Sequence, residues 1–180
     1  MKRFVIFLSV LVFNSSLIAK ISEETEYACG NGLDEILEPI RNWMKAYTER
    51  NPELALATFS QSKTVLLVGT GADEFREGHQ GLKNEIQRDL AQSQNLEFQL
   101  SNFRFSCLGQ VAWGYLDIAV HPTIEGQDFA YPSVRASYTL VKESGAWKAH
   151  MAHFSVPDAH QEVGHSFRMA DSLAVYSCPK

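Results

Sequence analysis

Four long segments of alternating apolar and polar residues fill the second half of the chain and limit the folds that it can adopt. They span residues 96–107, 111–121, 133–142 and 147–156. Alternation with a period of two predicts β-strands. Leu108-Gly109-Gln110 and Glu143-Ser144-Gly145-Ala146 are short enough for hairpin turns. The segments therefore predict a meander of long antiparallel strands.

Three helices are expected before these strands. Residues 33–47 carry apolar side chains at steps of three and four, and residues 79–92 carry them at three positions spaced by four. Between them, Asn51-Pro52-Glu53 has the capping residue, the proline and the acid that open a short helix. Helices followed by a strand meander predict an α+β fold, with the helices packed on one face of a curved, mostly antiparallel sheet.

The chain of 180 residues is long enough for one domain. Its first 19 residues combine Lys2 and Arg3 with an apolar run and a polar boundary, which predicts a secretory signal peptide. The alternative is a membrane anchor, but the apolar run is shorter than the ~20 residues of a spanning helix. We expect a leader at 20–32, the domain at 33–157 and a C-terminal tail at 158–180. The predicted location is periplasmic or secreted, without membrane attachment after cleavage.

Charge and cysteine spacing argue against two classes of function. The formal net charge is −5, and loss of residues 1–19 removes two basic groups, so no basic stripe remains for nucleic acid. The three cysteines lack a Cys-x-x-Cys spacing, so no metal site is expected. Cys29 and Cys178 bracket the domain and are the candidate disulfide of an exported protein, although nothing excludes pairing with Cys107.

The last strand carries the first candidates for a functional site. Alternation places His153 and Ser155 on one face of this strand, and His150 and Phe154 on the other. Two histidines three residues apart on a strand diverge, which argues against a metal-ligand pair.

The neighbouring strands are expected to add polar groups to the face of His153. If Val141 faces Trp147 across the hairpin, Arg135 lies opposite His153. The strand at 111–121 contributes Trp113, Tyr115 and Asp117. Together these groups would line the concave side of the sheet, where a helix closes a pocket. The alternative is a structural ion pair between Arg135 and Asp117, with His153 as a hydrogen-bonded core residue.

The order of elements and five short motifs resemble the nuclear transport factor 2-like superfamily, and more specifically the SnoaL-like domains. The motifs are residues 65–71, 73–78, 109–113, 134–139 and 147–155. The resemblance covers roughly residues 33–157. It implies a cone-shaped, cystatin-like fold related to those of ketosteroid isomerase, scytalone dehydratase and polyketide cyclases. This fold carries enzymes, binding modules and oligomerisation domains alike, so it does not define a chemistry.

The resemblance also suggests roles for individual side chains. Trp43 and Tyr47 on the first helix would line the cone, with Tyr47 in the place of an oxyanion-holding tyrosine. Residues 68–72 contain no carboxylate, which argues against isomerase chemistry. His153 is then the best catalytic candidate, and no cofactor is implied. The charged residues at 74 and 76 form either a gate at the mouth of the cone or a solvated loop.

Three functions compete at this point. The first is an exported domain that binds a small, partly apolar molecule, anionic or carbonyl-bearing because of Arg135. The second is a cofactor-independent isomerase, cyclase or dehydratase with His153 as acid or base. The third is a non-catalytic dimerisation module, with His150, Phe154 and Tyr138 on the convex face of a homodimer.

Overall fold

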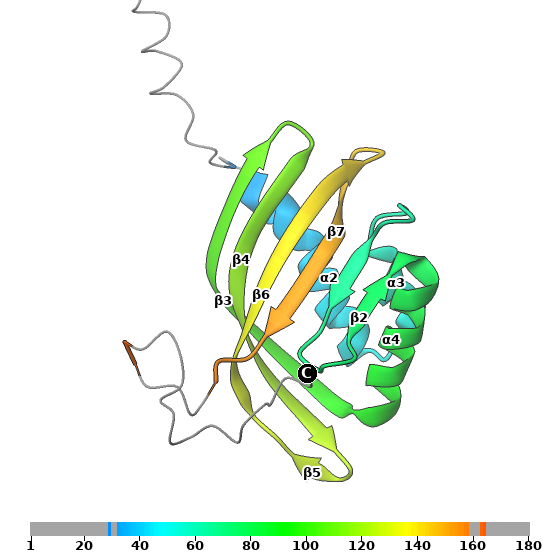
Figure 1. Cartoon of the computed structure of the whole chain (residues 1–180), viewed down its shortest axis with the longest axis vertical. Coiled ribbons are helices and arrows are strands. Elements are labelled where there is room, and N and C mark those ends of the chain that lie inside the picture. The colour runs from blue at the N-terminus through cyan, green and yellow to red at the C-terminus, as the bar shows by residue number, and fades with distance from the viewer. Residues whose placement is uncertain (1–28, 30–31, 159–162, 165–180) are drawn as a thin grey trace, which may run out of the picture.

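One strongly curved sheet forms the centre of the protein (Figure 1). The structure is a computed structural model that describes residue 29, residues 32–158 and residues 163–164. The strands lie in the order β2-β1-β7-β6-β4-β3, and β5 pairs with β4. Their bounds are β1 Leu66–Val68, β2 Phe75–Glu77, β3 Gln94–Leu108, β4 Val111–Ile124, β5 Gln127–Asp128, β6 Tyr131–Glu143 and β7 Ala146–Ser155. The pairs are antiparallel except for β1 with β7, so the predicted α+β class and sheet type are confirmed.

Within the described residues, three helices cover the concave side and the open flank of this sheet. They are α2 Leu33–Thr48, α3 Pro52–Ala57 and α4 Gly78–Gln92. The predicted start of α3 is confirmed, because the side chain of Asn51 accepts a hydrogen bond from the backbone N–H of Leu54 at 3.0 Å. Helix α2 crosses the concave face, whereas α4 stands beside β1 and β2 (Figure 1).

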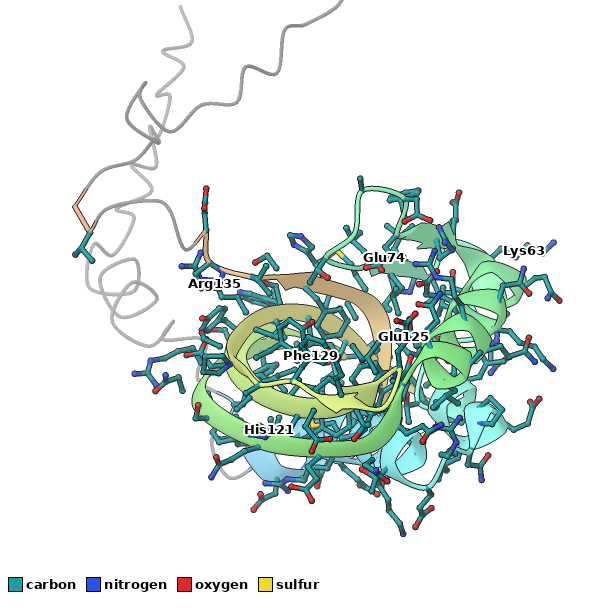
Figure 2. The ribbon with its side chains drawn as sticks, turned by 90° about the horizontal axis from the view of Figure 1, so that it is seen from below. Lys63, Glu74, His121, Glu125, Phe129 and Arg135 are labelled. Carbon is teal, nitrogen blue, oxygen red and sulfur yellow. A yellow bond between two sulfur atoms is a disulfide. The ribbon has the colours of Figure 1, made fainter. Side chains whose placement is uncertain are left out.

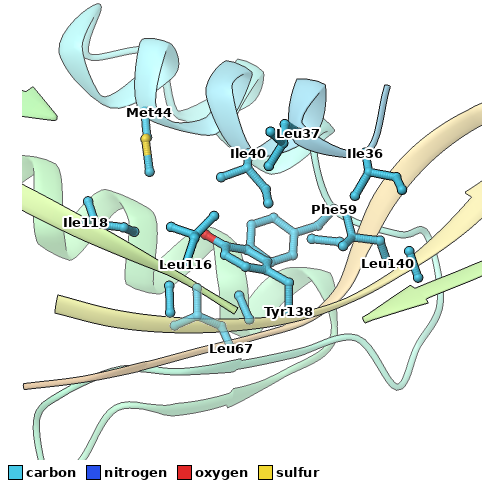
Figure 3. Packing of buried hydrophobic residues seen from close by; sticks show 14 of the residues in the cluster. Ile36, Leu37, Ile40, Met44, Phe59, Leu67, Leu116, Ile118, Tyr138 and Leu140 are labelled. Atoms are coloured by element: carbon cyan, nitrogen blue, oxygen red, sulfur yellow. The ribbon is translucent and has the colours of Figure 1, made fainter. Parts of the chain in front are cut away.

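The main hydrophobic core lies between α2 and the concave face (Figure 3). The helix contributes one apolar stripe, and the sheet contributes the inward side chains of several strands. The residues labelled in the figure are Ile36, Leu37, Ile40 and Met44 from α2, and Phe59, Leu67, Leu116, Ile118, Tyr138 and Leu140 from elsewhere in the chain. Burial of such side chains contributes roughly 1.5–3 kcal/mol each, so this contact holds the helix on the sheet.

The short strands β1 and β2 determine where α4 lies. Strand β1 pairs in parallel with β7, and β2 folds back on β1. Gly78 then turns the chain into α4 with a φ of 70°, a conformation that favours glycine, and its N–H donates to the carbonyl oxygen of Val65 at 2.8 Å. The side of α4 that carries Glu85 and Asp89 is thereby brought to the edge of the concave side.

The predicted register between β6 and β7 is wrong because the hairpin is shorter than expected and β7 contains a bulge. Lys142, and not Val141, lies opposite Trp147. The pairing then shifts between Thr139 and Leu140, where His150 is the extra residue on β7. As a result Arg135 pairs with Ser155, and His153 pairs with Ser137.

The bulge also reverses which side chains of β7 face inward. Ala149 and Ala152 are both buried although they lie three residues apart, and Phe154 packs against the core. The expectation that Phe154 and Tyr138 lie on the convex face is therefore wrong. His153 is exposed on that face instead.

The disulfide joins Cys29 to Cys107, with Cα atoms 5.1 Å apart, so the pairing of Cys29 with Cys178 is wrong. Cys107 lies near the end of β3, and both cysteines pack against the core beside the start of α2. The bond therefore attaches the segment before α2 to the sheet. Cys178 lies outside the described residues.

The predicted signal peptide and most of the leader and tail lie outside the described residues. Within the described ranges, no helix has the length and apolar character needed to cross a bilayer.

Candidate functional site

A cavity of about 300 Å³ lies between α2, α4 and the concave face of the sheet. Its walls are mostly apolar, with polar groups gathered on the side of α4. Figure 2 looks toward the end of the sheet where β5 lies, with Glu74 near α4. The lining residues are Trp43, Tyr47, Leu67, Gly69, Thr70, Glu74, Glu85, Asp89, Gln92, Ser93, Leu96, Phe98, Ile118, Val120, Pro122, Ile124, Val134 and Phe154.

The aromatic wall comes from α2 and from two strands. Trp43 and Tyr47 lie one turn apart on α2, and their ring centroids are 4.4 Å apart. Trp43 also stacks on Phe154 with centroids 5.4 Å apart, and Phe98 meets Tyr47 edge-on at 6.4 Å. The structure places Trp43 and Tyr47 in the cavity, where the sequence predicted them. Among the described residues, the buried Nε1 of Trp43 has no hydrogen-bond partner.

Asp89 is the main polar group on the opposite wall. The hydroxyl of Tyr47 donates a hydrogen bond to Oδ2 of Asp89 at 2.9 Å. The pKa of Asp89 is raised to about 6, mainly by burial; the hydrogen bond from Tyr47 opposes this rise, and the charges of Glu85 and Glu74 add to it. Burial, followed by the charge of Asp89, raises the pKa of Tyr47 well above its usual value, so Tyr47 keeps its proton.

Glu85 lies one turn before Asp89 and is almost completely buried. Its Oε2 is 2.7 Å from Nη2 of Arg76, and its Oε1 is 2.5 Å from Nη2 of Arg88. A buried carboxylate needs such partners, since an unpaired charge in the interior is strongly destabilising. The two arginines therefore supply charge partners for Glu85 at the cavity wall.

Glu74 lies at the mouth of the cavity and is held by the turn between β1 and β2. Its Oε2 accepts from the N–H of Gly71 at 2.7 Å, and its Oε1 is 3.0 Å from Nη2 of Arg88. A Cβ at Gly69 would come within 2.1 Å of Oε2 of Glu74. Glycine at 69 is therefore required for this position of the carboxylate, which lines the cavity.

The remaining predicted site residues lie on the convex face. Tyr115 donates to Asp117, and Asn102 donates to the other oxygen of Asp117 at 2.6 Å, which lowers the pKa of Asp117. Arg135 pairs with Asp117 in register and lies across the curled sheet from α4 (Figure 2). The placement of six residues in the cone is thus wrong: Trp113, Tyr115, Asp117, Arg135, His153 and Ser155.

These residues are predicted on the wrong face of the sheet because an alternation with a period of two separates the two faces of a strand without showing which of them is concave. On β4 the buried set is Ala112, Leu116 and Ile118, and the more polar set faces outward. Within the described residues, no group of three or more histidine, cysteine or acidic side chains is arranged to hold a metal ion.

The sequence reasoning missed Asp89 and Glu85. The signal was present, because both acids are interleaved with Leu82, Ile86 and Leu90 on the stripe of α4 that faces the protein. Acids four residues apart at the edge of an apolar helix face are usually exposed to solvent. Here α2 and β1 cover this edge of α4, and only the tertiary structure reveals that they do.

Comparisons with known proteins agree with this fold. The model of the SnoaL-like domain matches residues 36–159. This chain belongs to the SnoaL-like domain family. A search of curated proteins finds no match.

Solved structures show the same fold at low sequence identity. A nuclear transport factor 2-like superfamily protein from Salmonella enterica is 18% identical, with a TM-score of 0.67 over 78% of this chain and 100% of that one. A candidate dehydratase of the NTF2-like family from Streptomyces avermitilis is 14% identical, with a TM-score of 0.63 over 71% and 97%. A candidate scytalone dehydratase from Novosphingobium aromaticivorans is 13% identical, with a TM-score of 0.63 over 70% and 84%.

Proposed function

We propose that this protein is an exported SnoaL-like domain that binds a small, largely apolar molecule in the concave cavity. The observation that carries the proposal is the cavity of about 300 Å³, which has aromatic walls and one hydrogen-bonded polar pair, Tyr47 and Asp89. A concave, mostly apolar space with a few convergent polar groups is the usual form of a small-molecule site. The disulfide supports export, because such bonds persist in oxidising compartments.

The charge of the cavity changes the expected ligand. Arg135 lies on the convex face, so it offers nothing to a molecule in the cavity. The charged side chains that line it are Glu74, Glu85 and Asp89. These groups disfavour an anion, and the anionic ligand expected from the sequence is withdrawn.

Native mass spectrometry of the mature, oxidised protein from its exporting host tests the proposal. We expect a small-molecule adduct on the wild-type protein and on Ala119→Phe, and none on Val120→Phe. Val120 lines the cavity, whereas Ala119 precedes it on the same strand and faces outward. Circular dichroism shows whether both variants are folded. An empty wild-type protein, or an adduct that survives on a folded Val120→Phe variant, would contradict the proposal.

The Tyr47–Asp89 pair favours a second candidate function, that of an acid–base enzyme of the isomerase, cyclase or dehydratase kind. A carboxyl group with a pKa of about 6 inside a cavity can exchange protons near neutrality. Asp89 replaces His153 in this role, because His153 lies on the convex face. Deuterium exchange at the carbon next to the carbonyl of small cyclic ketones, followed by NMR, tests this function. Exchange that persists in Asp89→Asn would contradict it.

A further inference from the structure

The charged groups of the cavity indicate which ligands it selects. Glu74, Glu85 and Asp89 line it, and no lysine, arginine or histidine is among the described lining residues. We propose, building on the binding function above, that the cavity takes an organic cation, which is an amine or quaternary ammonium group on an apolar body.

The arginines near the cavity balance its carboxylates only in part. Arg88 contacts three carboxylates, on the turn before β2 and on α4, and Arg76 contacts one of these, Glu85. Asp73 is exposed and does not line the cavity, so the two arginines offset the two lining carboxylates Glu74 and Glu85 and leave Asp89 without a charge partner. Neither guanidinium lines the cavity, so both offset the charge of the carboxylates without contacting the space inside it. A cation inside the cavity adds the missing positive charge, whereas an anion is repelled.

Asp89 is the group that a cation would meet. Tyr47 provides its hydrogen bond, and no lysine, arginine or histidine nitrogen lies within 4.0 Å of its carboxylate among the described residues. A largely buried carboxylate with a single neutral donor is poorly stabilised. A bound ammonium group would supply the charge partner that the protein itself does not provide.

The aromatic wall fits the same class of ligand. Trp43, Tyr47, Phe98 and Phe154 line the cavity across from the carboxylates of α4. Aromatic faces attract cations, and tryptophan does so most strongly. The apolar body of the ligand would pack on Ile118, Val120 and Val134. One compact site thereby offers a carboxylate, aromatic faces and an apolar floor.

The pH dependence separates a cation from a neutral ligand. A cation prefers ionised Asp89, so its affinity rises as the pH passes about 6 and falls by up to about tenfold per pH unit below this value. A neutral carbonyl compound prefers protonated Asp89 and the N–H of Trp43, and its affinity changes in the opposite sense. The two ligand classes therefore give opposite slopes.

Two probes of the same shape test the inference: phenyltrimethylammonium and tert-butylbenzene, which differ by one charge. Their binding to the mature, oxidised protein is measured by ligand-observed NMR at pH 5 and pH 8. At pH 8 we expect the cation to bind at least about tenfold more tightly than the hydrocarbon. Asp89→Asn should remove most of this preference. The control Asp117→Asn changes a carboxylate on the convex face and should preserve it.

The outcomes separate this inference from the binding function on which it rests. Equal binding of both probes, or tighter binding of tert-butylbenzene, overturns the cation inference and leaves a cavity for neutral molecules. A preference that survives Asp89→Asn and is lost in Asp117→Asn places the cation on the convex face and overturns the inference. Binding of neither probe overturns the binding function as well.

Discussion

Replacement of Asp89 by asparagine should stabilise the protein above pH 6. The pKa of Asp89 rises from 3.8 to about 6 on folding, so the folded state holds the proton more tightly than the unfolded state. Stability is therefore greatest below pH 3.8 as far as this group is concerned, and it declines as the pH rises to about 6. At about 1.4 kcal/mol per pH unit between these values, the decline is about 3 kcal/mol.

Asparagine has the same shape and carries no charge, so it avoids this loss. It keeps an acceptor for the hydroxyl of Tyr47, and the pKa of about 6 already includes the stronger hydrogen bond to the ionised carboxylate. We therefore expect Asp89→Asn to be more stable than the wild type by about 3 kcal/mol at pH 7.5. Near pH 4 the two proteins should be equally stable.

Urea denaturation of the oxidised protein at pH 4, 5, 6 and 7.5 measures this difference. The control is Asp117→Asn, because hydrogen bonds from Asn102 and Tyr115 lower the pKa of Asp117. A group of this kind stabilises the fold above its unfolded pKa, so its removal should destabilise the protein at pH 7.5. A pH-independent difference for Asp89→Asn, or a loss of stability at pH 7.5, would show that ionised Asp89 does not destabilise the folded protein.

Four further predictions concern the fold and its surface. Leu116→Ala in the main core should lower the free energy of unfolding by about 2–5 kcal/mol in urea titrations. Cys107→Ser removes a disulfide whose cysteines are 78 residues apart, and it should cost about 4 kcal/mol, whereas Cys178→Ser should change little. Gly114→Ala places a Cβ 2.3 Å from the carbonyl oxygen of Arg104 and should lower stability by more than 1 kcal/mol by the same assay. Sedimentation should show a homodimer through the convex face that Trp113→Glu dissociates; a wild-type monomer would contradict this prediction.

The elements of the fold could be predicted because each has a local signal. The alternation of residues 96–156 and the cap at Asn51 both depend on short stretches of sequence, and both are confirmed. The choice of inner face could not be made in this way. It depends on the bulge at His150 and on which side α2 packs, and both are set by tertiary contacts.

The candidate site was predictable only where one helix defines it. Trp43 and Tyr47 follow from the apolar stripe of α2, which faces the sheet in any arrangement of this kind. Asp89 comes from an element 42 residues further along the chain and meets Tyr47 only because β1 pairs with β7. Cys107 similarly lies beside Cys29 because β3 ends next to the start of α2.

Carbon-13 NMR of the Asp89 carboxyl, titrated with and without the two probes, tests whether the concave cavity is the binding site. We expect Asp89 to titrate near pH 6 and each bound probe to shift the signals of Asp89 and Trp43 together. An Asp89 that titrates near 3.8, with probe-induced shifts confined to Trp113 and its neighbours on the convex face, would contradict this expectation.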